Sequence, residues 1–322
     1  MNTGADSDTQ KSGGHGRRPS IEQGPAPAKP LEALWPVASL LLAATLWGLF
    51  WYPLRRFEAN GLSGLWQSLF IYCGTLVAAL PMLRGRWREL GRDPGALIVL
   101  AAASGWCNTA FILAMLDGHV VRVLLLFYLS PVWATLLAVW LLGEHLTRVG
   151  VLVLILAMAG ALIMLWTPGM GLPWPREVAD WLALSSGFGF ALTNVMVRRM
   201  QVVSVRVKTV VAWVGVILMA GALIVIRGAP LGDVASPVWL TALAFGAVVM
   251  VVMTLSVQYG VTHMPVHRSA IILLFELVVG AVSAGLLTNE TVQLHEWAGG
   301  IFIVGAAYLS SRHATRDDHE PH

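Results

Sequence analysis

The stretches RVLLLFYLSPVWATLLAVWLLGE (122–144) and RSAIILLFELVVGAVSAGLLTNE (268–290) decide the fold of this chain. They align without a gap at one constant offset of 146 residues, which takes 122 to 268 and 144 to 290. The aligned pairs include charged and small residues: Arg122 with Arg268, Glu144 with Glu290, Ala134 with Gly280, and Ala138 with Ala284. Because small residues four apart let helix backbones approach closely in lipid, the pattern predicts two equivalent membrane helices.

A second pair of segments extends the duplication toward the N terminus. WGLFWYPLRR (47–56) aligns with FALTNVMVRR (190–199) at an offset of 143 residues, so that Arg55 meets Arg198. One short loop difference between the copies explains why the two offsets are not the same. Charged and small positions align as well as the apolar ones, so we interpret the chain as two related halves rather than as a chance likeness between leucine-rich helices.

The composition indicates that most of the surface faces lipid. Of the 322 residues, 57% are hydrophobic and 12% are charged, whereas soluble domains carry about 25% charged residues. The two cysteines, Cys73 and Cys107, lie inside apolar runs, so a disulfide framework is not indicated. The basic residues lie in loops and tails, and the net charge of +3 therefore predicts membrane orientation rather than a nucleic-acid partner.

Ten apolar segments follow one another, each near the length that crosses a bilayer at a helical rise of ~1.5 Å per residue. We predict an all-α integral membrane protein with spans at 34–54, 63–83, 96–116, 120–142, 149–166, 179–197, 209–226, 238–260, 267–288 and 294–311. Residues 31–168 form the first predicted repeat and residues 177–311 the second, between a disordered cytoplasmic tail at 1–30 and a cytoplasmic tail at 312–322. Five spans per copy is an odd number, so the second copy must be inverted relative to the first.

The distribution of Lys and Arg predicts the orientation. Of the 21 Lys and Arg residues, 16 fall on the side of the N terminus and 5 on the opposite side. By the positive-inside rule, both termini of a multi-pass protein in the cell (inner or plasma) membrane are then cytoplasmic. An even number of spans agrees with this placement. Inverted repeats of this kind are typical of secondary transporters, in which two similar halves expose a central site to either face in turn.

SPVWATLLAVWLLGEHLT (130–147) resembles the end of the fourth helix in EamA-like members of the drug/metabolite transporter superfamily, where a proline and small residues precede a Gly-Glu pair. LFELVVGAVSAGLLTNETV (274–292) looks like the second copy, with Leu277 in place of the usual proline and Asn289 in place of the usual glycine. The resemblance extends over residues 35–311. It implies ten helices in an inverted five-plus-five arrangement and the transport, often export, of amino acids, metabolites or drugs.

Glu276 is the first candidate site residue, because it lies near the middle of the ninth predicted span. An ionised carboxylate at that depth costs several kcal/mol unless it is paired or hydrated. One hypothesis is that Glu276 faces a central cavity, where it takes a proton during the cycle or binds a cationic part of the substrate. The alternative is a neutral carboxylic acid that joins helices by hydrogen bonds.

The equivalent of Glu276 in the first copy is Ser130, next to Pro131. Pro131 is predicted to kink the helix and to free the carbonyl of Phe127 for a ligand or a water; a simple packing kink is the alternative. Tyr128 is also a cavity candidate, although it is two residues from Ser130 and need not share its helix face.

Other cavity candidates come from aromatic and amide residues at equivalent places. Trp47 and Trp51 lie four apart on one helix face, as do their counterparts Phe190 and Asn194. Such a set suits a flat or cationic solute, and packing or an aromatic belt is the alternative. Two further polar residues lie deep in spans and either hydrogen-bond neighbouring helices or line water: Asn108 in the third span and Gln258 in the eighth.

No catalytic or nucleotide-binding motif occurs in the sequence. There is no Walker A loop, no H-E-x-x-H and no G-x-S-x-G, and His313, His319 and His322 are interpreted as part of a solvated tail. We therefore expect a transporter rather than an enzyme, without a metal or cofactor, working as a monomer or a homodimer. The predicted function is secondary or facilitative export of an amino acid or related metabolite, with protons as the candidate coupling ion. The alternatives are uptake of a vitamin-like or drug-like cation and a lipid or headgroup flippase.

Overall fold

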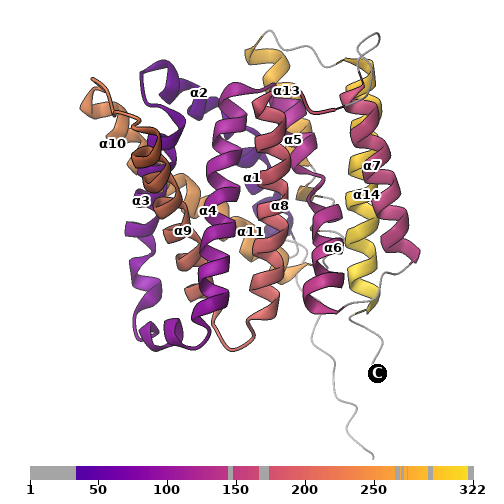
Figure 1. Ribbon diagram of the computed structural model, residues 1–322, viewed down its shortest axis with the longest axis horizontal. Helices are drawn as coiled ribbons and strands as arrows, with labels where there is room; N and C mark the ends of the chain where they lie inside the picture. Colours follow the sequence, from indigo (N-terminus) through magenta and orange to yellow (C-terminus); the bar gives the residue numbers. More distant parts are fainter. Residues whose placement is uncertain are drawn as a thin grey trace, which may run out of the picture.

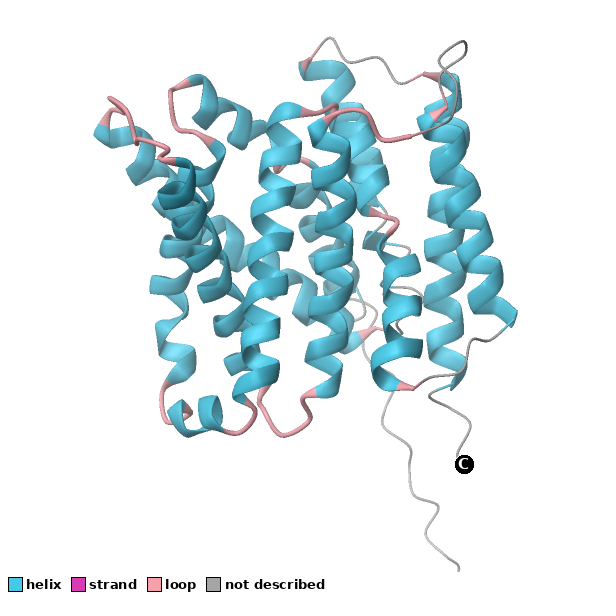
Figure 2. Cartoon of the chain, viewed as in Figure 1, coloured by secondary structure: helices cyan, strands magenta, loops and turns pink. Residues whose placement is uncertain are grey.

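The computed structural model describes residues 34–143, 148–166, 174–264, 269, 272–273, 275–288 and 293–317. Within these residues the chain forms helices and turns and no strand (Figures 1 and 2). The predicted tail at 1–30 lies outside the described residues, as do Glu144, Arg268 and Glu290. At the other end, the last helix continues past residue 311 as far as Asp317.

The helices in chain order are α1 (Leu34–Gly48), α2 (Trp51–Ala59), α3 (Gly64–Ala79), η1 (Leu80–Leu83), η2 (Trp87–Gly91), α4 (Pro94–Asp117), α5 (Val120–Phe127), α6 (Ser130–Leu142), α7 (Arg148–Leu165), α8 (Val178–Arg199), α9 (Val205–Arg227), α10 (Ser236–Phe245), the π-helix η3 (Gly246–Met250), α11 (Val251–His263), α13 (Phe275–Leu287) and α14 (Leu294–Asp317). Consecutive helices that follow one another within one predicted span count as one membrane helix, as α1 and α2 do. Counted in this way, the described residues form the ten predicted membrane helices. The upper end of Figure 1 carries the loops at 60–63, 118–119 and 228–235; the lower end carries those at 84–93 and 200–204.

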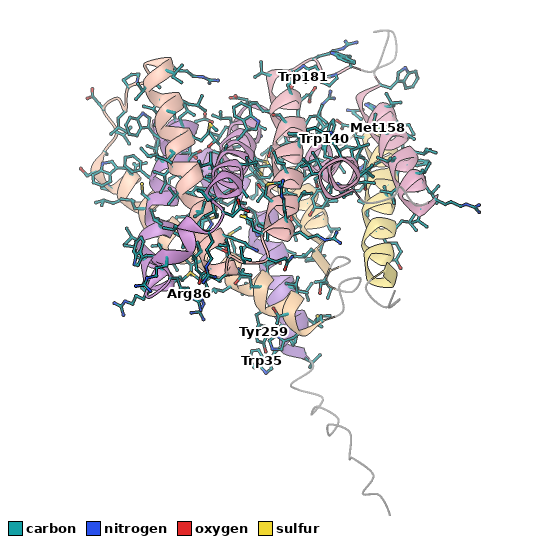
Figure 3. The ribbon with its side chains drawn as sticks, turned by 60° about the horizontal axis from the view of Figure 1, so that its bottom comes forward. Trp35, Arg86, Trp140, Met158, Trp181 and Tyr259 are labelled. Atoms are coloured by element: carbon teal, nitrogen blue, oxygen red, sulfur yellow. The ribbon has the colours of Figure 1, made fainter. Side chains whose placement is uncertain are left out.

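The surface of the helix bundle is apolar. Six helices of the described chain are long and apolar enough, by length and composition, to cross a membrane. Large apolar side chains lie outside on most helices, which in a membrane protein places them in lipid. Five tryptophans near the ends of the predicted spans are exposed, where an aromatic belt would place them. Figure 3 labels Trp35, Trp140 and Trp181, and the other two are Trp166 and Trp174.

Three of the ten membrane helices are interrupted, which hydropathy alone does not show. The first breaks at residues 49–50, between α1 and α2, and the fourth breaks at 128–129, between α5 and α6. Pro131 lies in the first turn of α6, where its missing N–H costs no hydrogen bond. The eighth contains the π-helix at Gly246–Met250. Breaks of this kind, buried inside a bundle, expose backbone groups only to protein or to a cavity.

Glycines allow the closest helix crossings. A Cβ atom on Gly215 of α9 would overlap the carbonyl of Ala101 on α4, and one on Gly246 would overlap the carbonyl of Ile71 on α3. The hydroxyl of Thr75 also donates to the carbonyl oxygen of Gly246 at 3.0 Å. Backbone-to-backbone packing of this kind, with hydrogen bonds between helices, is how membrane helices associate in lipid.

The helix contacts have the symmetry of an inverted duplication. α4 packs on α8 as α11 packs on α1, and α6 packs on α8 as α13 packs on α1. α4 also packs on α9 as α10 and the π-helix pack on α3. The remaining large contacts join equivalent helices to each other: α3 with α9, α5 with α13, and α7 with α14 (Figure 1). The predicted fold, ten helices in two inverted five-helix repeats, is confirmed.

Candidate functional site

Glu276 and Tyr128 meet beside the break in the fourth membrane helix. Tyr128 follows the last residue of α5, and its hydroxyl donates to Oε2 of Glu276 at 2.9 Å. Glu276 lies in the first turn of α13, where the helix dipole stabilises negative charge. Its side chain is partly exposed. The contact joins the two halves of the chain at a place where one carboxyl and one phenol face each other.

The first membrane helix crosses α13 beside this contact. A Cβ atom on Gly48 would lie 2.7 Å from the carbonyl oxygen of Glu276, so α1 touches the α13 backbone directly. One turn on, Nε1 of Trp51 donates to Oγ of Ser283 at 3.0 Å, and Trp51 is only 1% exposed. In this structure Trp51 therefore holds α2 against α13. Trp47 is partly exposed, one turn from the break.

Asn108 belongs to a separate polar group between α3 and α4. The hydroxyl of Tyr72 donates to Oδ1 of Asn108 at 2.6 Å, and Nδ2 of Asn108 donates to the carbonyl of Ser104 at 2.9 Å. The Asn108 amide thus hydrogen-bonds a neighbouring helix, one of the two alternatives that its depth leaves open. Gln258 lies on α11 and is partly exposed. No described contact joins either residue to Glu276.

Phe190 and Asn194, the candidate residues on α8, lie on the helix that packs against the α5–α6 break. Asn194 is exposed and lies one turn beyond Phe190, whose ring centroid is 5.3 Å from that of Phe127. The carbonyl of Phe127 faces the α8 backbone, since a Cβ atom on Gly187 would lie 2.8 Å from that oxygen. Ser130 is buried at the start of α6. The ring of Phe127 thus contacts both Tyr128, at 6.0 Å between centroids, and Phe190, and Asn194 is one helical turn beyond Phe190.

A buried ion pair was missed by the sequence analysis. Nε and Nη2 of Arg122 donate to the two carboxylate oxygens of Asp180 at 2.7 and 2.9 Å, and Asp180 is 1% exposed. A membrane arginine at a helix start is usually read as reaching lipid headgroups, but here it joins α5 to α8 instead. A weaker form of the signal that singled out Glu276 was present: Asp180 is an acid inside the predicted span at 179–197, although it lies at the edge of that span and not near its middle.

At the lower end, two loops from different halves are joined. Oε2 of Glu89 accepts a hydrogen bond from the backbone N–H of Ser204 at 2.8 Å, and Oε1 lies 3.0 Å from Nη1 of Arg86. Hydrogen bonding to Ser204, followed by the contact with Arg86, lowers the pKa of Glu89. Nη1 of Arg92 adds a hydrogen bond to the carbonyl of Val202 at 2.8 Å.

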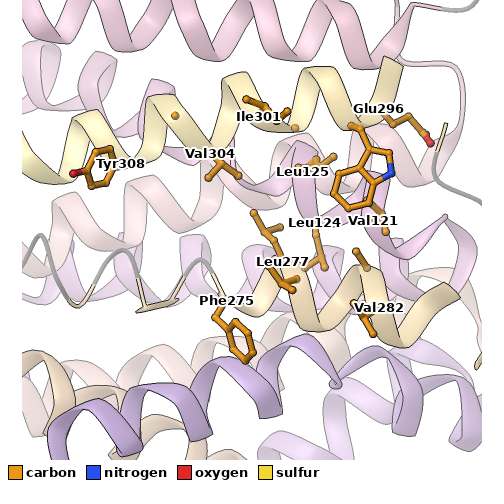
Figure 4. A pocket seen from close by; sticks show the side chains of 15 residues that line it. Val121, Leu124, Leu125, Phe275, Leu277, Val282, Glu296, Ile301, Val304 and Tyr308 are labelled. Atoms are coloured by element: carbon orange, nitrogen blue, oxygen red, sulfur yellow. The ribbon is translucent and has the colours of Figure 1, made fainter. Parts of the chain in front are cut away.

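A cavity of about 810 Å³ lies on the other side of α13 from Glu276, between α5, α13 and α14 (Figure 4). Its walls are apolar, with Glu296 and Trp297 at the upper end and Tyr308 toward the lower end. Val278, Val282 and Ile301 line it and are also exposed, so the cavity opens sideways at the surface of the bundle. None of the predicted site residues lines it. We call it the lateral groove.

Similarity to other proteins agrees with the fold. A transporter of Pseudomonas aeruginosa, named uncharacterized transporter PA0485, is 33% identical over 159 residues, 46% of this chain and 50% of that protein. An uncharacterized transporter of Archaeoglobus fulgidus is 26% identical over 275 residues, 85% of this chain and 96% of that protein. Protein RarD of Salmonella typhi is 30% identical over 144 residues, 43% of this chain and 44% of that protein.

The first of these matches spans only about half the length of its relative. A solved crystal structure with 17% sequence identity has a TM-score of 0.53, covering 88% of this chain and 98% of that chain, which shows a shared fold alone. The EamA-like transporter family model matches the chain twice, at residues 34–166 and 178–312. Two family matches, one in each half of an inverted ten-helix bundle, lead to one conclusion: this chain is a membrane transport protein and belongs to the EamA-like transporter family.

Proposed function

We propose that the protein exports a small organic solute, an amino acid or related metabolite, by alternating access between the two faces of the cell membrane. The observation that carries the proposal is the hydrogen bond of 2.9 Å between Tyr128 and Glu276. Each half of the inverted repeat supplies one partner. A contact between the halves, beside interrupted helices, is where the substrate of such a transporter binds.

The chemistry of this contact favours a solute with a protonated amine. The Glu276 carboxylate can exchange its bond with Tyr128 for a bond with an ammonium group or with a proton. The nearby rings of Phe127 and Phe190 can pack on the apolar part of the solute or interact with its positive charge. Either exchange links substrate binding to the contact between the halves, which supports protons as the coupling ion.

The arginine distribution supports cytoplasmic termini. The lower end carries the basic loop at 84–92 and the basic end of α8, and α14 also ends there (Figure 1). By the positive-inside rule this end faces the cytoplasm. A cytoplasmic solute would then reach the site from the lower end.

Ligand-dependent thermal stabilisation of the purified protein tests the substrate class. Amino acids, vitamins, drug-like cations and lipids are compared for the wild type and for Glu276→Gln. We expect an amine-bearing metabolite to raise the melting temperature of the wild type and to have little effect on Glu276→Gln. Glu58→Gln, at an exposed carboxyl on α2, is the matched control and should respond as the wild type does. Equal stabilisation of all three proteins would exclude Glu276 from the binding site.

A lipid or headgroup flippase is the second candidate, and the lateral groove favours it. The groove is apolar and opens sideways, with Glu296 and Trp297 at its upper end, as an acyl chain with a polar headgroup would require. Translocation of fluorescent lipids in proteoliposomes tests this candidate. Val278→Trp, which narrows the groove, would slow lipid translocation in a flippase and leave the export of a small solute unchanged.

A further inference from the structure

The lateral groove lies where the helices of the bundle are least closely packed. α7 and α14 pack mainly on each other, and a Cβ atom on Gly160 of α7 would lie 2.6 Å from the carbonyl oxygen of Gly299 of α14. In contrast, α14 makes only slight contacts with α5 and α6 among the described residues. The groove of about 810 Å³ occupies the space between α14, α5 and α13 (Figure 4). It therefore separates the α7–α14 pair from much of the rest of the bundle.

The opening of the groove faces the hydrocarbon of the bilayer. Val278 and Val282 of α13 and Ile301 of α14 line the groove, and each of these side chains is more than half exposed. They belong to membrane helices, so the space beside them is filled by lipid rather than by water. An apolar space that stays empty loses dispersion contacts along its walls, and it offers water no polar partners. The groove therefore favours an acyl chain as its occupant.

The upper end of the groove carries one carboxyl group. Glu296, in the first turn of α14, is the only acidic or basic residue among the described residues that line the groove (Figure 4). Its Oε2 accepts a hydrogen bond from the backbone N–H of Gln293 at 2.9 Å, and no hydrogen bond to its Oε1 is found among the described residues. Exposed Trp297 beside it marks the depth at which headgroups begin. A carboxylate oxygen at this depth favours a headgroup with an ammonium N–H to donate.

A positive charge lies close to this carboxylate. Arg122 follows the lining residue Val121 on α5 and lies near enough to Glu296 for the two charges to interact. Its Nε and Nη2 are bound to Asp180, whereas no hydrogen bond of Nη1 is found among the described residues, and the side chain is 16% exposed. A zwitterionic headgroup matches this pair of charges, with its phosphate toward Arg122 and its ammonium toward Glu296. An anionic headgroup would instead be repelled by Glu296.

We propose that the lateral groove is a binding site for one phosphatidylethanolamine molecule, with an acyl chain along α13 and the ammonium group on Glu296. The lipid stays bound and fills the space between α14 and the rest of the bundle, whereas the flippase considered above would move it across the membrane. Phosphatidylcholine is a poorer fit, because its trimethylammonium group has no N–H to donate and Trp297 alone does not form an aromatic cage. The proposal goes beyond the export of a solute and does not depend on it.

Native mass spectrometry of the full-length protein tests the proposal. The protein is delipidated in detergent and titrated with phosphatidylethanolamine, phosphatidylcholine or phosphatidylglycerol, all with palmitoyl and oleoyl chains, and its melting temperature is measured with each lipid. The wild type should retain one phosphatidylethanolamine per chain and bind it about tenfold more tightly than phosphatidylglycerol, the effect of one charge-assisted contact. Phosphatidylethanolamine should also raise the melting temperature most.

Two carboxyl variants test the headgroup contact. Glu296→Gln should bind phosphatidylethanolamine about tenfold more weakly and lose the preference over phosphatidylglycerol, while its amide oxygen can still accept from the first turn of α14. Glu177→Gln is the matched control, because Glu177 is exposed, also lies near enough to Arg122 to interact with it, and does not line the groove. Its lipid preference should equal that of the wild type.

Two tryptophan variants test the acyl-chain contact. Val282→Trp places a large ring in the groove and should weaken the binding of all the lipids alike. Leu286→Trp adds the same ring one turn further along α13, at an exposed position outside the groove, and should bind the lipids as the wild type does. Equal losses in the two variants would show that the lipid binds elsewhere and would overturn the site.

A preference for phosphatidylethanolamine that is lost in Glu296→Gln and kept in Glu177→Gln supports the lipid site. Equal binding of phosphatidylcholine or phosphatidylglycerol by the wild type, or a preference that persists in Glu296→Gln, would overturn it. Fluorescent phosphatidylethanolamine that crosses to the other leaflet of vesicles in a groove-dependent way would replace the bound lipid by a flippase substrate. Lipid binding by a protein that no amine-bearing solute stabilises would retain this site and remove the proposed export.

Discussion

The equivalent helices α6 and α13 have kept their packing residues and changed their polar ones. Ala134 and Ala138 of α6 correspond to Gly280 and Ala284 of α13, so both helices present small residues to their neighbours. At the start of the helices the copies differ, with buried Ser130 in one and Glu276 in the other. The duplication preserved small residues that build the bundle, and we propose that solute binding depends on positions where the copies have diverged.

The α1–α2 and α8 segments show the same division. Gly48 and Gly187 each bring a helix backbone against a carbonyl oxygen of the crossing segment. In contrast, buried Trp51 corresponds to exposed Asn194, and Val37 to buried Asp180. Buried Trp51 forms a hydrogen bond with Ser283, and buried Asp180 forms an ion pair with Arg122; the residues equivalent to Trp51 and Asp180 in the other half form no such contact among those described. Substitutions at these positions therefore measure what the divergence contributes.

The largest expected effect on stability is at Asp180. Asp180→Ala leaves Arg122 largely buried without its partner, which predicts a loss of about 3–5 kcal/mol in the free energy of unfolding. Thermal unfolding in detergent measures it. Because the double variant Asp180→Leu/Arg122→Leu leaves no unpaired charge, most of the loss should be recovered. A double variant as unstable as Asp180→Ala would show that the pair itself, and not the unpaired arginine, accounts for the loss.

A smaller loss of stability is expected when Gly280 of α13 is replaced by alanine, the residue at the equivalent position of α6. In Gly280→Ala the new Cβ would lie 2.5 Å from Cδ1 of Leu124, so either the buried Leu124 side chain must shift or α13 and α5 must move apart. Overpacking of this kind costs about 1–3 kcal/mol. The reverse change, Ala134→Gly, removes a methyl group from α6 and costs about 1 kcal/mol through helix propensity. Equal melting temperatures for the two variants would contradict the close approach at Gly280.

The hydrogen bond between Trp51 and Ser283 predicts a change of about 1 kcal/mol. Ser283→Ala should lose about that amount of unfolding free energy. Trp51→Phe should lose more, because the smaller ring also leaves a cavity at a buried position, and the double variant should lose no more than Trp51→Phe alone. The matched position in the other half, Leu137, corresponds to Ser283 and has no hydroxyl to lose. Additive losses in this cycle would show that the two side chains act independently.

The sequence alone was enough to predict the ten helices and their inversion, and it singled out Glu276 as a candidate site residue. Hydropathy and a constant offset locate helices along the chain, and a lone carboxyl in an apolar run is visible by inspection. The partners of these residues were not predictable, because they depend on how each helix is rotated about its axis. The hydrogen-bond partners of Tyr128 and Tyr72 could therefore be identified only from the structure. The lateral groove was equally invisible, since most residues on its walls are apolar residues of the kind found throughout the membrane helices.

The smallest effect is expected at the lower loops and depends on pH. Hydrogen bonds from Ser204 lower the pKa of Glu89, so its contribution to stability is present above the unfolded pKa of about 4.3. That contribution is lost as pH falls through the lower, folded pKa. The protection factor of the Ser204 amide, its exchange rate compared with that of an unfolded chain at the same pH, should therefore fall in acid and should already be low at neutral pH in Glu89→Gln. Unchanged exchange in Glu89→Gln would show that the loops are held by Arg92 instead.

Transport itself tests the divergence of Ser130 and Glu276 most directly. Wild type, Glu276→Gln and Ser130→Ala are reconstituted in proteoliposomes, and counterflow of the amine-bearing solute that best stabilises the wild type is measured with and without a pH gradient. We expect rapid counterflow of the solute by the wild type and by Ser130→Ala. Glu276→Gln should be at least about tenfold slower, the effect of losing one charge-assisted contact. Wild-type rates and an unchanged response to the pH gradient in Glu276→Gln would contradict the proposal that Glu276 binds the solute or the coupling proton.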